Sequence, residues 1–107
     1  MAARKSPPKK SPFSLHVRNR RKKLLQRYGL TQEDYDDLLT SQKGGCAVCG
    51  STDPRSRTAK HLFVDHCHFT GKVRGLLCHH CNSGIGKLGD NPTLLRAAAD
   101  YIERNRQ

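Results

Sequence analysis

The fold of this chain is decided by the stretch that begins at Cys46-Ala47-Val48-Cys49 and ends at Cys78-His79-His80-Cys81-Asn82. Each end contains a Cys-x-x-Cys pair, and 28 residues separate the two pairs. Paired thiols at this spacing are typical of one closed, tetrahedral, four-cysteine zinc site. The sequence therefore predicts a structural zinc ion, bound by Cys46, Cys49, Cys78 and Cys81, that joins the two ends of the intervening segment.

Other metal-binding side chains lie close to these pairs and leave alternatives open. A histidine can replace a thiolate in a zinc site, so His61, His79 and His80 are weaker candidates for a ligand. Cys67 is the fifth and odd cysteine, and we interpret it as an ordinary small side chain near the site. The sequence assigns no role to Cys67 or His61.

The composition indicates one small intracellular domain that needs the zinc for stability. Only 35% of the 107 residues are hydrophobic and none is Trp, so a thin core is expected. An odd number of cysteines without an apolar N-terminal signal segment disfavours a secreted disulfide framework and favours the cytoplasm. No apolar run approaches the length of a membrane span, and no membrane partner is expected.

The charge predicts a polyanionic partner. The formal net charge is +11, and residues 1–28 hold ten of the twenty Lys and Arg without a single acid. Nucleic acid is the partner that fits best, although basic residues that only keep the domain soluble are the alternative. Residues 1–13 are expected to form a disordered basic tail, for which a localisation signal or a solubilising role are alternatives.

Two helices are predicted over residues 14–45. The first runs from about Ser14 to Tyr28, with Gly29 after its end, and offers phosphate contacts from Arg18, Arg20, Arg21, Lys22 and Lys23. The second begins at a variant capping box of Thr31 and Asp34 and runs to about Gln42.

A zinc-bound core is predicted over residues 46–89, followed by a C-terminal helix within 90–107. Short strands at 62–64 and 73–77 are joined by a turn at 69–72, and a helix begins near Cys78 or His79 and ends at 86–89. The last helix covers about 92–104 after an Asn91 N-cap. Its expected buried face consists of Leu94, Leu95, Ala98, Tyr101 and Ile102. The fold class is therefore small α+β.

Asp65, His66 and Asn82 carry the expected chemistry. Hydrolysis of a phosphodiester needs a base for the attacking water and a cation beside the phosphate. Asp65 and the neutral oxygen of Asn82 suit Mg²⁺ or Mn²⁺, and His66 can accept a proton near neutral pH. Adjacent residues on a regular strand point to opposite faces, so Asp65 and His66 can serve one metal only where the strand ends or bulges. Surface polarity and zinc ligation are the alternative interpretations.

The run from Val64 to Asn82, Val-Asp-His-Cys-His-Phe-Thr-Gly-Lys-Val-Arg-Gly-Leu-Leu-Cys-His-His-Cys-Asn, resembles the motif of the phage recombination endonuclease VII family. The upstream Tyr28-Gly29-Leu30-Thr31, Tyr35 and the first Cys-x-x-Cys pair are similar too, so the resemblance covers about residues 28–89. This family belongs to the His-Me finger (ββα-metal, HNH-related) nucleases. The resemblance implies a zinc-clasped ββα finger with flanking helices, located in the bacterial host cytosol if a phage encodes it.

The resemblance also implies roles for individual residues. It places Mg²⁺ on Asp65 and Asn82, His66 as the general base, and His68 as a phosphate contact or an aid to the leaving group. Arg74 is a further candidate nucleic-acid contact. The expected function is metal-dependent DNA cleavage, at branched or Holliday-junction DNA or on plain duplex.

Several departures and alternatives remain. Cys67 stands where the family often has an acidic residue. The characterised resolvase of the family dimerises through extended helices, whereas this chain has one short helix after the finger, so a homodimer stays an open alternative. The rival functions are a non-catalytic zinc module that binds DNA, a nicking nuclease without junction preference, and a nuclease that acts on RNA.

Overall fold

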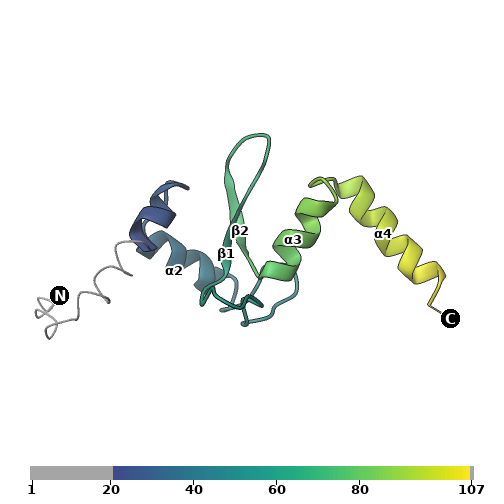
Figure 1. Ribbon diagram of the computed structural model, residues 1–107, viewed down its shortest axis with the longest axis horizontal. Helices are drawn as coiled ribbons and strands as arrows, with labels where there is room; N and C mark the ends of the chain where they lie inside the picture. The colour runs from purple at the N-terminus through teal and green to yellow at the C-terminus, as the bar shows by residue number, and fades with distance from the viewer. Residues whose placement is uncertain (1–20, 107) are drawn as a thin grey trace, which may run out of the picture. The chain divides into compact units, whose positions relative to one another are not determined.

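The computed structural model describes residues 21–106 and confirms the small α+β fold class (Figure 1). The chain divides into two compact units at Asp36/Asp37, so the described parts are 21–36 and 37–106. The predicted tail 1–13 and the first part of the predicted helix 14–28, including Arg18 and Arg20, lie outside the described residues. After a helical segment at 21–26, the elements are α2 (Gln32–Ser41), β1 (Phe63–His66), β2 (Val73–Leu77), α3 (His79–Lys87) and α4 (Pro92–Arg104).

Gly29 ends the first described helix, as its position in the sequence predicts. Its φ of +72° is the left-handed conformation that glycine adopts without steric cost. The Gly29 N–H donates to the Gln26 carbonyl and the Leu30 N–H donates to the Leu25 carbonyl, both at 3.0 Å. This pair of bonds is the Schellman motif that closes many helices. Leu25, at 1% exposure, is among the most buried side chains of the chain.

The predicted capping box begins α2. The Asp34 N–H donates to Thr31 Oγ1 at 3.0 Å, and the Thr31 N–H donates to Asp34 Oδ2 at 3.0 Å. Two amides that would lack a partner at a helix N-terminus are thereby satisfied reciprocally. At the other end, Lys43 adopts a φ of +58° and Gly44 donates to the Leu39 carbonyl at 2.8 Å. The helix therefore stops just before the first cysteine pair.

β1 and β2 form an antiparallel hairpin whose pairing is irregular at the predicted chemical residues. Asp65 is opposite Gly75, but His66 is opposite Val73, so Arg74 is the extra residue of a β-bulge. β1 also ends at His66 and therefore covers 63–66, not the predicted 62–64. β1 ends at His66, so one of the two conditions that allow Asp65 and His66 to serve one site is met, whereas the bulge lies in the opposite strand, β2.

The side chain of Gln42 links the end of α2 to β2 by hydrogen bonds within the second unit. Gln42 Nε2 donates to the Leu76 carbonyl at 3.0 Å, and Gln42 Oε1 accepts from the Leu76 N–H at 2.9 Å. The Ala47 N–H donates to the same carbonyl at 3.0 Å, so the knuckle of the first cysteine pair lies against this strand. Leu76 is fully buried, and its backbone polar groups are satisfied by these bonds.

Gly45 is required by the close approach of the chain at the start of the knuckle. A Cβ at this position would overlap the carbonyl oxygen of Gly50 and lie 2.9 Å from its carbon. We expect Gly45→Ala to lower the midpoint of thermal unfolding and the retention of zinc, because backbone must move to admit the methyl group. Gly84→Ala is the matched control, since nothing lies within 4 Å of a Cβ there. In the helix it should stabilise by about 0.5–1 kcal/mol. Equal effects of the two substitutions would contradict this account.

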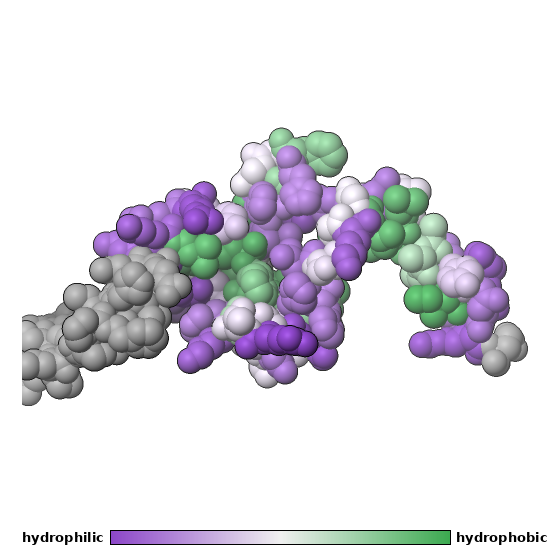
Figure 2. All heavy atoms as spheres, viewed as in Figure 1, coloured by the Kyte–Doolittle hydropathy of each residue, from purple (hydrophilic) through white to green (hydrophobic). Residues whose placement is uncertain are grey.

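The predicted bounds of α4 are confirmed, but its predicted buried face is wrong. No residue of α4 is buried, and the exposed fractions of Leu94, Tyr101 and Ile102 are 48%, 61% and 53%. Leu95 and Ala98 are half-buried. Hydrophobic side chains gather at the surface over α4 in Figure 2. The spacing of apolar residues shows that a helix has an apolar face, but it does not show whether another element covers that face. No other described helix or strand packs extensively against α4.

Candidate functional site

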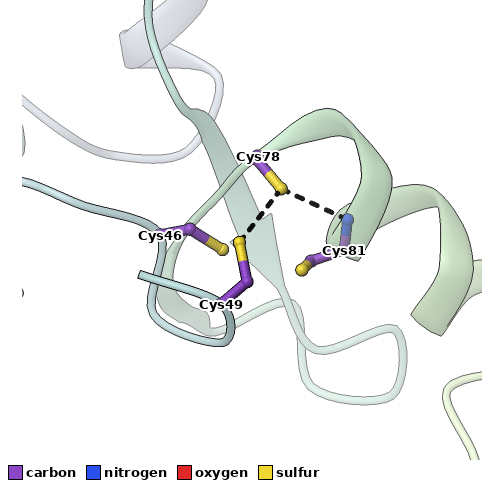
Figure 3. A group of neighbouring side chains, drawn as sticks. All are labelled: Cys46, Cys49, Cys78 and Cys81. Carbon is purple, nitrogen blue, oxygen red and sulfur yellow. Dashed lines mark hydrogen bonds between the residues drawn. The ribbon is translucent and has the colours of Figure 1, made fainter. Parts of the chain in front are cut away.

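Four cysteines form a metal-sized cluster at the base of the hairpin (Figure 3). Their Sγ atoms all lie within 4.8 Å of one another, and Cys49 Sγ is 3.7 Å from Cys78 Sγ. Thiolates about 2.3 Å from a tetrahedral zinc ion would lie about 3.8 Å apart, whereas a disulfide needs about 2 Å. The residues present therefore fit zinc, and all four cysteines are free.

The electrostatics of the cluster also favour a bound cation. The Val48 N–H donates to Cys46 Sγ at 3.4 Å, and the Cys81 N–H donates to Cys78 Sγ at 3.5 Å. Although burial raises the pKa of Cys46, hydrogen bonds from its neighbours lower it overall to about 6. Burial and the neighbouring cysteines raise the pKa of Cys81 to about 12, because each further thiolate adds like charge. A divalent cation offsets this repulsion.

The weaker candidates for zinc ligation do not belong to this cluster. Among residues 21–106, the four cysteines are the only group of three or more His, Cys, Asp or Glu donors that could hold an ion. The His79 ring instead lies 6.0 Å from the Phe63 ring and 6.3 Å from the His80 ring. Cys67 begins the hairpin loop, where a hydrogen bond with Thr70 lowers the pKa of its thiol. The role of Cys67 and of His61 is not assigned by these contacts.

Asp65 is held by an arginine on the neighbouring strand. Arg74 Nε donates to Asp65 Oδ2 at 2.7 Å, and Arg74 Nη2 donates to Asp65 Oδ1 at 3.0 Å. The side chain of Asp65 is 12% exposed, so its charge is largely shielded from water. Because Arg74 is the extra residue of the bulge, its side chain reaches the face that Asp65 occupies.

Asp90 belongs to the same cluster, although the sequence pattern around it does not predict this role. Arg74 Nη2 donates to Asp90 Oδ1 at 2.8 Å, and Arg74 Nη1 donates to Asp90 Oδ2 at 3.2 Å. The pKa of Asp90 is lowered, chiefly by these bonds and in part by His68. In the sequence, Gly89-Asp90-Asn91-Pro92 indicates only a helix boundary. The pairing of Asp90 with Arg74 spans 16 residues and has no local signal.

The two motif histidines lie together at the end of β1. The rings of His66 and His68 are 5.4 Å apart in an edge-to-face arrangement. His66 is the last residue of the strand, and His68 lies in the loop that follows. The structure thus gathers Asp65, His66, His68 and Arg74 at one end of the hairpin.

Asn82 lies in the first turn of α3, next to the zinc cluster. Cys78 is the N-cap of this helix, and the Asn82 N–H donates to the Cys78 carbonyl at 3.0 Å. α3 packs against both β1 and β2. The four cysteines that would bind zinc therefore join the start of the helix that carries Asn82 to the knuckle at 46–49, while the helix itself packs against the strand that carries Asp65.

The predicted phosphate contacts at the described end of the basic helix differ in their surroundings. The guanidinium of Arg21 lies 4.3 Å from the centroid of the Tyr35 ring, which is a cation–π contact within the first unit. Lys22 and Lys23 are exposed. Of these three cations, the two lysines are more accessible to a ligand.

Comparisons with known proteins identify a family and two similar phage proteins. The family model described as Recombination endonuclease VII matches residues 21–104. The chain is 40% identical over 83 residues to the Gene 59 protein of Mycobacterium phage D29, covering 77% of this chain and 48% of that protein. It is 36% identical over 81 residues to the Gene 59 protein of Mycobacterium phage L5, covering 75% and 48%. This chain thus spans about half the length of the curated relatives it matches.

No solved structure matches this chain. None of the helices in the described part of the chain is long and apolar enough to cross a membrane. The family match extends from the basic helix through α4 and includes all four cysteines and the Asp65-His66 pair. The chain therefore belongs to the recombination endonuclease VII family.

Proposed function

We propose that this protein is a zinc-stabilised, Mg²⁺- or Mn²⁺-dependent DNA endonuclease that hydrolyses phosphodiester bonds and leaves 5′-phosphates. The observation that carries the proposal is the irregular end of β1, which presents Asp65 and His66 beside a helix whose first turn carries Asn82. Binding DNA alone does not require a buried carboxylate and a histidine pair at this place. Family membership supports nuclease activity, and the Gene 59 relatives are phage proteins.

The residues at the end of β1 fit a catalytic divalent ion. Asp65 and Asn82 would hold it, because carboxylate and amide oxygens are the hard ligands that Mg²⁺ prefers. Both oxygens of the Asp65 carboxylate accept hydrogen bonds from Arg74, so the ion would compete with this guanidinium for them. Such an ion would supply charge stabilisation at the phosphate and at the leaving oxygen.

The other roles belong to side chains of the chain itself. His66 would accept a proton from the attacking water, because an imidazole nitrogen at the end of β1 can act as a general base. His68, whose ring lies 5.4 Å from that of His66, would contact the phosphate or assist the leaving oxygen. Arg74 would contact a bound phosphate through the one N–H of its Nη1 that the two carboxylates do not use. The two histidines and Arg74 would thus surround the reacting group.

DNA binding should depend strongly on the basic N-terminal segment. Deletion of residues 1–23 removes nine Lys and Arg, so the plot of log affinity against log salt concentration should flatten. The double variant Lys22→Gln/Lys23→Gln should lower the slope by up to about 1.8, at about 0.9 for each phosphate that the protein no longer neutralises. Fluorescence anisotropy with labelled duplex measures both changes.

The variant Arg104→Gln/Arg106→Gln is the matched control, because it removes the same charge from the C-terminal end. If this arginine variant flattens the salt dependence of DNA affinity as much as the lysine variant does, net charge alone governs binding and the basic helix makes no specific contribution. An unchanged slope in the deletion variant would contradict the assignment of this segment to DNA.

The proposed activity is tested by offering several substrates to the zinc-loaded protein. A four-way junction, a linear duplex of matched sequence, supercoiled plasmid and a structured RNA are each incubated with Mg²⁺, with Mn²⁺ and with EDTA. We expect divalent-dependent cleavage of DNA. Faster cutting of the junction than of the duplex would assign branched DNA as the substrate, and equal rates would assign a nicking nuclease. Binding without cleavage of any substrate would instead support a non-catalytic DNA-binding module.

Two consequences of the proposal concern assembly and location. Paired cuts across a junction need two active sites, so junction cleavage would be accompanied by a homodimer, which light scattering with and without DNA would detect. The proposed site of action is the cytosol of the bacterial host, where phage DNA is accessible, and the similarity to two mycobacteriophage proteins supports this proposal.

A further inference from the structure

Arg74 is shared between two carboxylates that come from opposite ends of the finger. It makes two hydrogen bonds to Asp65 on β1 and two to Asp90, which lies between α3 and α4. The shortest contacts are 2.7 Å to Asp65 and 2.8 Å to Asp90. One guanidinium therefore neutralises only one of two negative charges, and the three groups together keep a charge of −1.

The position of Asp90 is fixed by the backbone. Its N–H donates to the Ile85 carbonyl at 3.0 Å, and the Gly89 N–H donates to the Gly86 carbonyl at 3.0 Å, which closes α3. Asp90 itself adopts a φ of +58°, a conformation that costs energy for a residue other than glycine. Its side chain is only 5% exposed. The hydrogen-bonded turn after α3 thus places the carboxylate beside Arg74.

We propose that Asp90 is a positioning residue that gives Arg74 a second carboxylate partner, so that a divalent cation can displace the guanidinium from Asp65. The inference rests on the proposed function, because it takes Asp65 as the ligand of that ion. Arg74 and the cation carry like charge and compete for the same two oxygens of Asp65. With Asp90 present, the displaced guanidinium keeps a charged partner and remains inside the site.

Two opposite effects on metal affinity follow. Asp90→Asn leaves Arg74 with Asp65 as its only carboxylate partner in this cluster, so Mn²⁺ should bind roughly tenfold more weakly, within the usual size of such couplings. Arg74→Gln removes the competing cation, so Mn²⁺ should bind more tightly. In a variant that already lacks Arg74, Asp90→Asn should change the affinity for Mn²⁺ only about threefold or less. This remaining effect comes from the direct attraction between the negative charge of Asp90 and the ion.

Mn²⁺ binding to the zinc-loaded protein without DNA, followed by the electron paramagnetic resonance of the free ion, measures these affinities independently of cleavage. Asp100→Asn is the matched control, since it removes the same charge from an exposed position of α4. Thermal unfolding of each variant shows whether it is folded. If Arg74→Gln does not fold, Arg74→Lys replaces it, because one ammonium cannot make paired bonds to both carboxylates.

The outcomes separate this inference from the function on which it rests. The inference is supported if Asp90→Asn lowers the affinity for Mn²⁺ strongly in the presence of Arg74 and only weakly in a variant that lacks Arg74. If Asp90→Asn lowers the affinity for Mn²⁺ equally with and without Arg74, Asp90 acts only as a nearby negative charge. If the affinity is unchanged, Asp90 has only a structural role. Either result overturns the inference. Failure of the wild-type protein to bind Mn²⁺ at all would remove the proposed metal site itself.

Discussion

The variant His66→Ala should cleave DNA roughly 10²–10⁴-fold more slowly than the wild type, while its affinity for DNA stays nearly unchanged. His66 would carry the proton transfer, whereas the divalent ion would be held by Asp65 and Asn82 and the fold by the zinc cluster. Removal of the imidazole should therefore act on the chemical step alone. Single-turnover cleavage at saturating protein, together with anisotropy in Ca²⁺ or EDTA, separates the rate from the affinity.

Two further variants control this experiment. His61→Ala removes an imidazole outside the end of β1 and should leave the rate close to that of the wild type. Asp65→Ala should lose activity for a different reason, weaker binding of the ion, and should recover in part as Mg²⁺ is raised. If His66→Ala were rescued by Mg²⁺ in the same way, His66 would be a metal-binding side chain and not the base.

Replacement of one cysteine of the cluster, in Cys46→Ser or Cys81→Ser, should abolish cooperative thermal unfolding or cause aggregation. Structural zinc sites contribute roughly 10–16 kcal/mol of binding free energy to folding, far more than the thin core of this chain could replace. Metal analysis should find one zinc per wild-type chain and much less in either variant. Circular dichroism against temperature shows the loss of the folded state.

Cys67→Ser is the matched control for these variants, because Cys67 is a thiol that lies outside the cluster. It should keep both its zinc content and its melting transition. Well-folded wild-type protein that contains no zinc, or a Cys81→Ser protein that melts like the wild type, would show that the cluster is not a structural metal site.

Features governed by neighbours in the chain could be predicted from the sequence. The spacing of the cysteine pairs identified the four residues that come together, because two Cys-x-x-Cys knuckles supply tetrahedral ligands locally. The capping box of Thr31 and Asp34 and the Asn91 N-cap of α4 also formed as expected. The capping groups, and the two cysteines within each pair, are two or three residues apart, so their local geometry depends little on the rest of the fold, although the hairpin has to bring the two pairs together.

Features that depend on distant parts of the chain could not be predicted in the same way. The sequence required a strand end or a bulge near Asp65, but it did not show that Arg74 would be the extra residue. Nor did it show that Asp90 would share Arg74, since that contact depends on how α3 packs on the hairpin. α4 has the apolar side chains that the sequence indicated, but a pattern within one helix does not reveal whether another element covers them.

The central claim is tested most directly by the ends that the zinc-loaded protein leaves on a nicked plasmid. Supercoiled DNA is incubated with Mg²⁺ or with EDTA, beside identically purified His66→Ala, and the nicked circles are then treated with DNA ligase, which joins only a 5′-phosphate to a 3′-hydroxyl. We predict divalent-dependent nicks that ligase reseals, and few nicks with His66→Ala. Absence of nicking in either Mg²⁺ or Mn²⁺, or equal nicking by His66→Ala, would contradict the assignment.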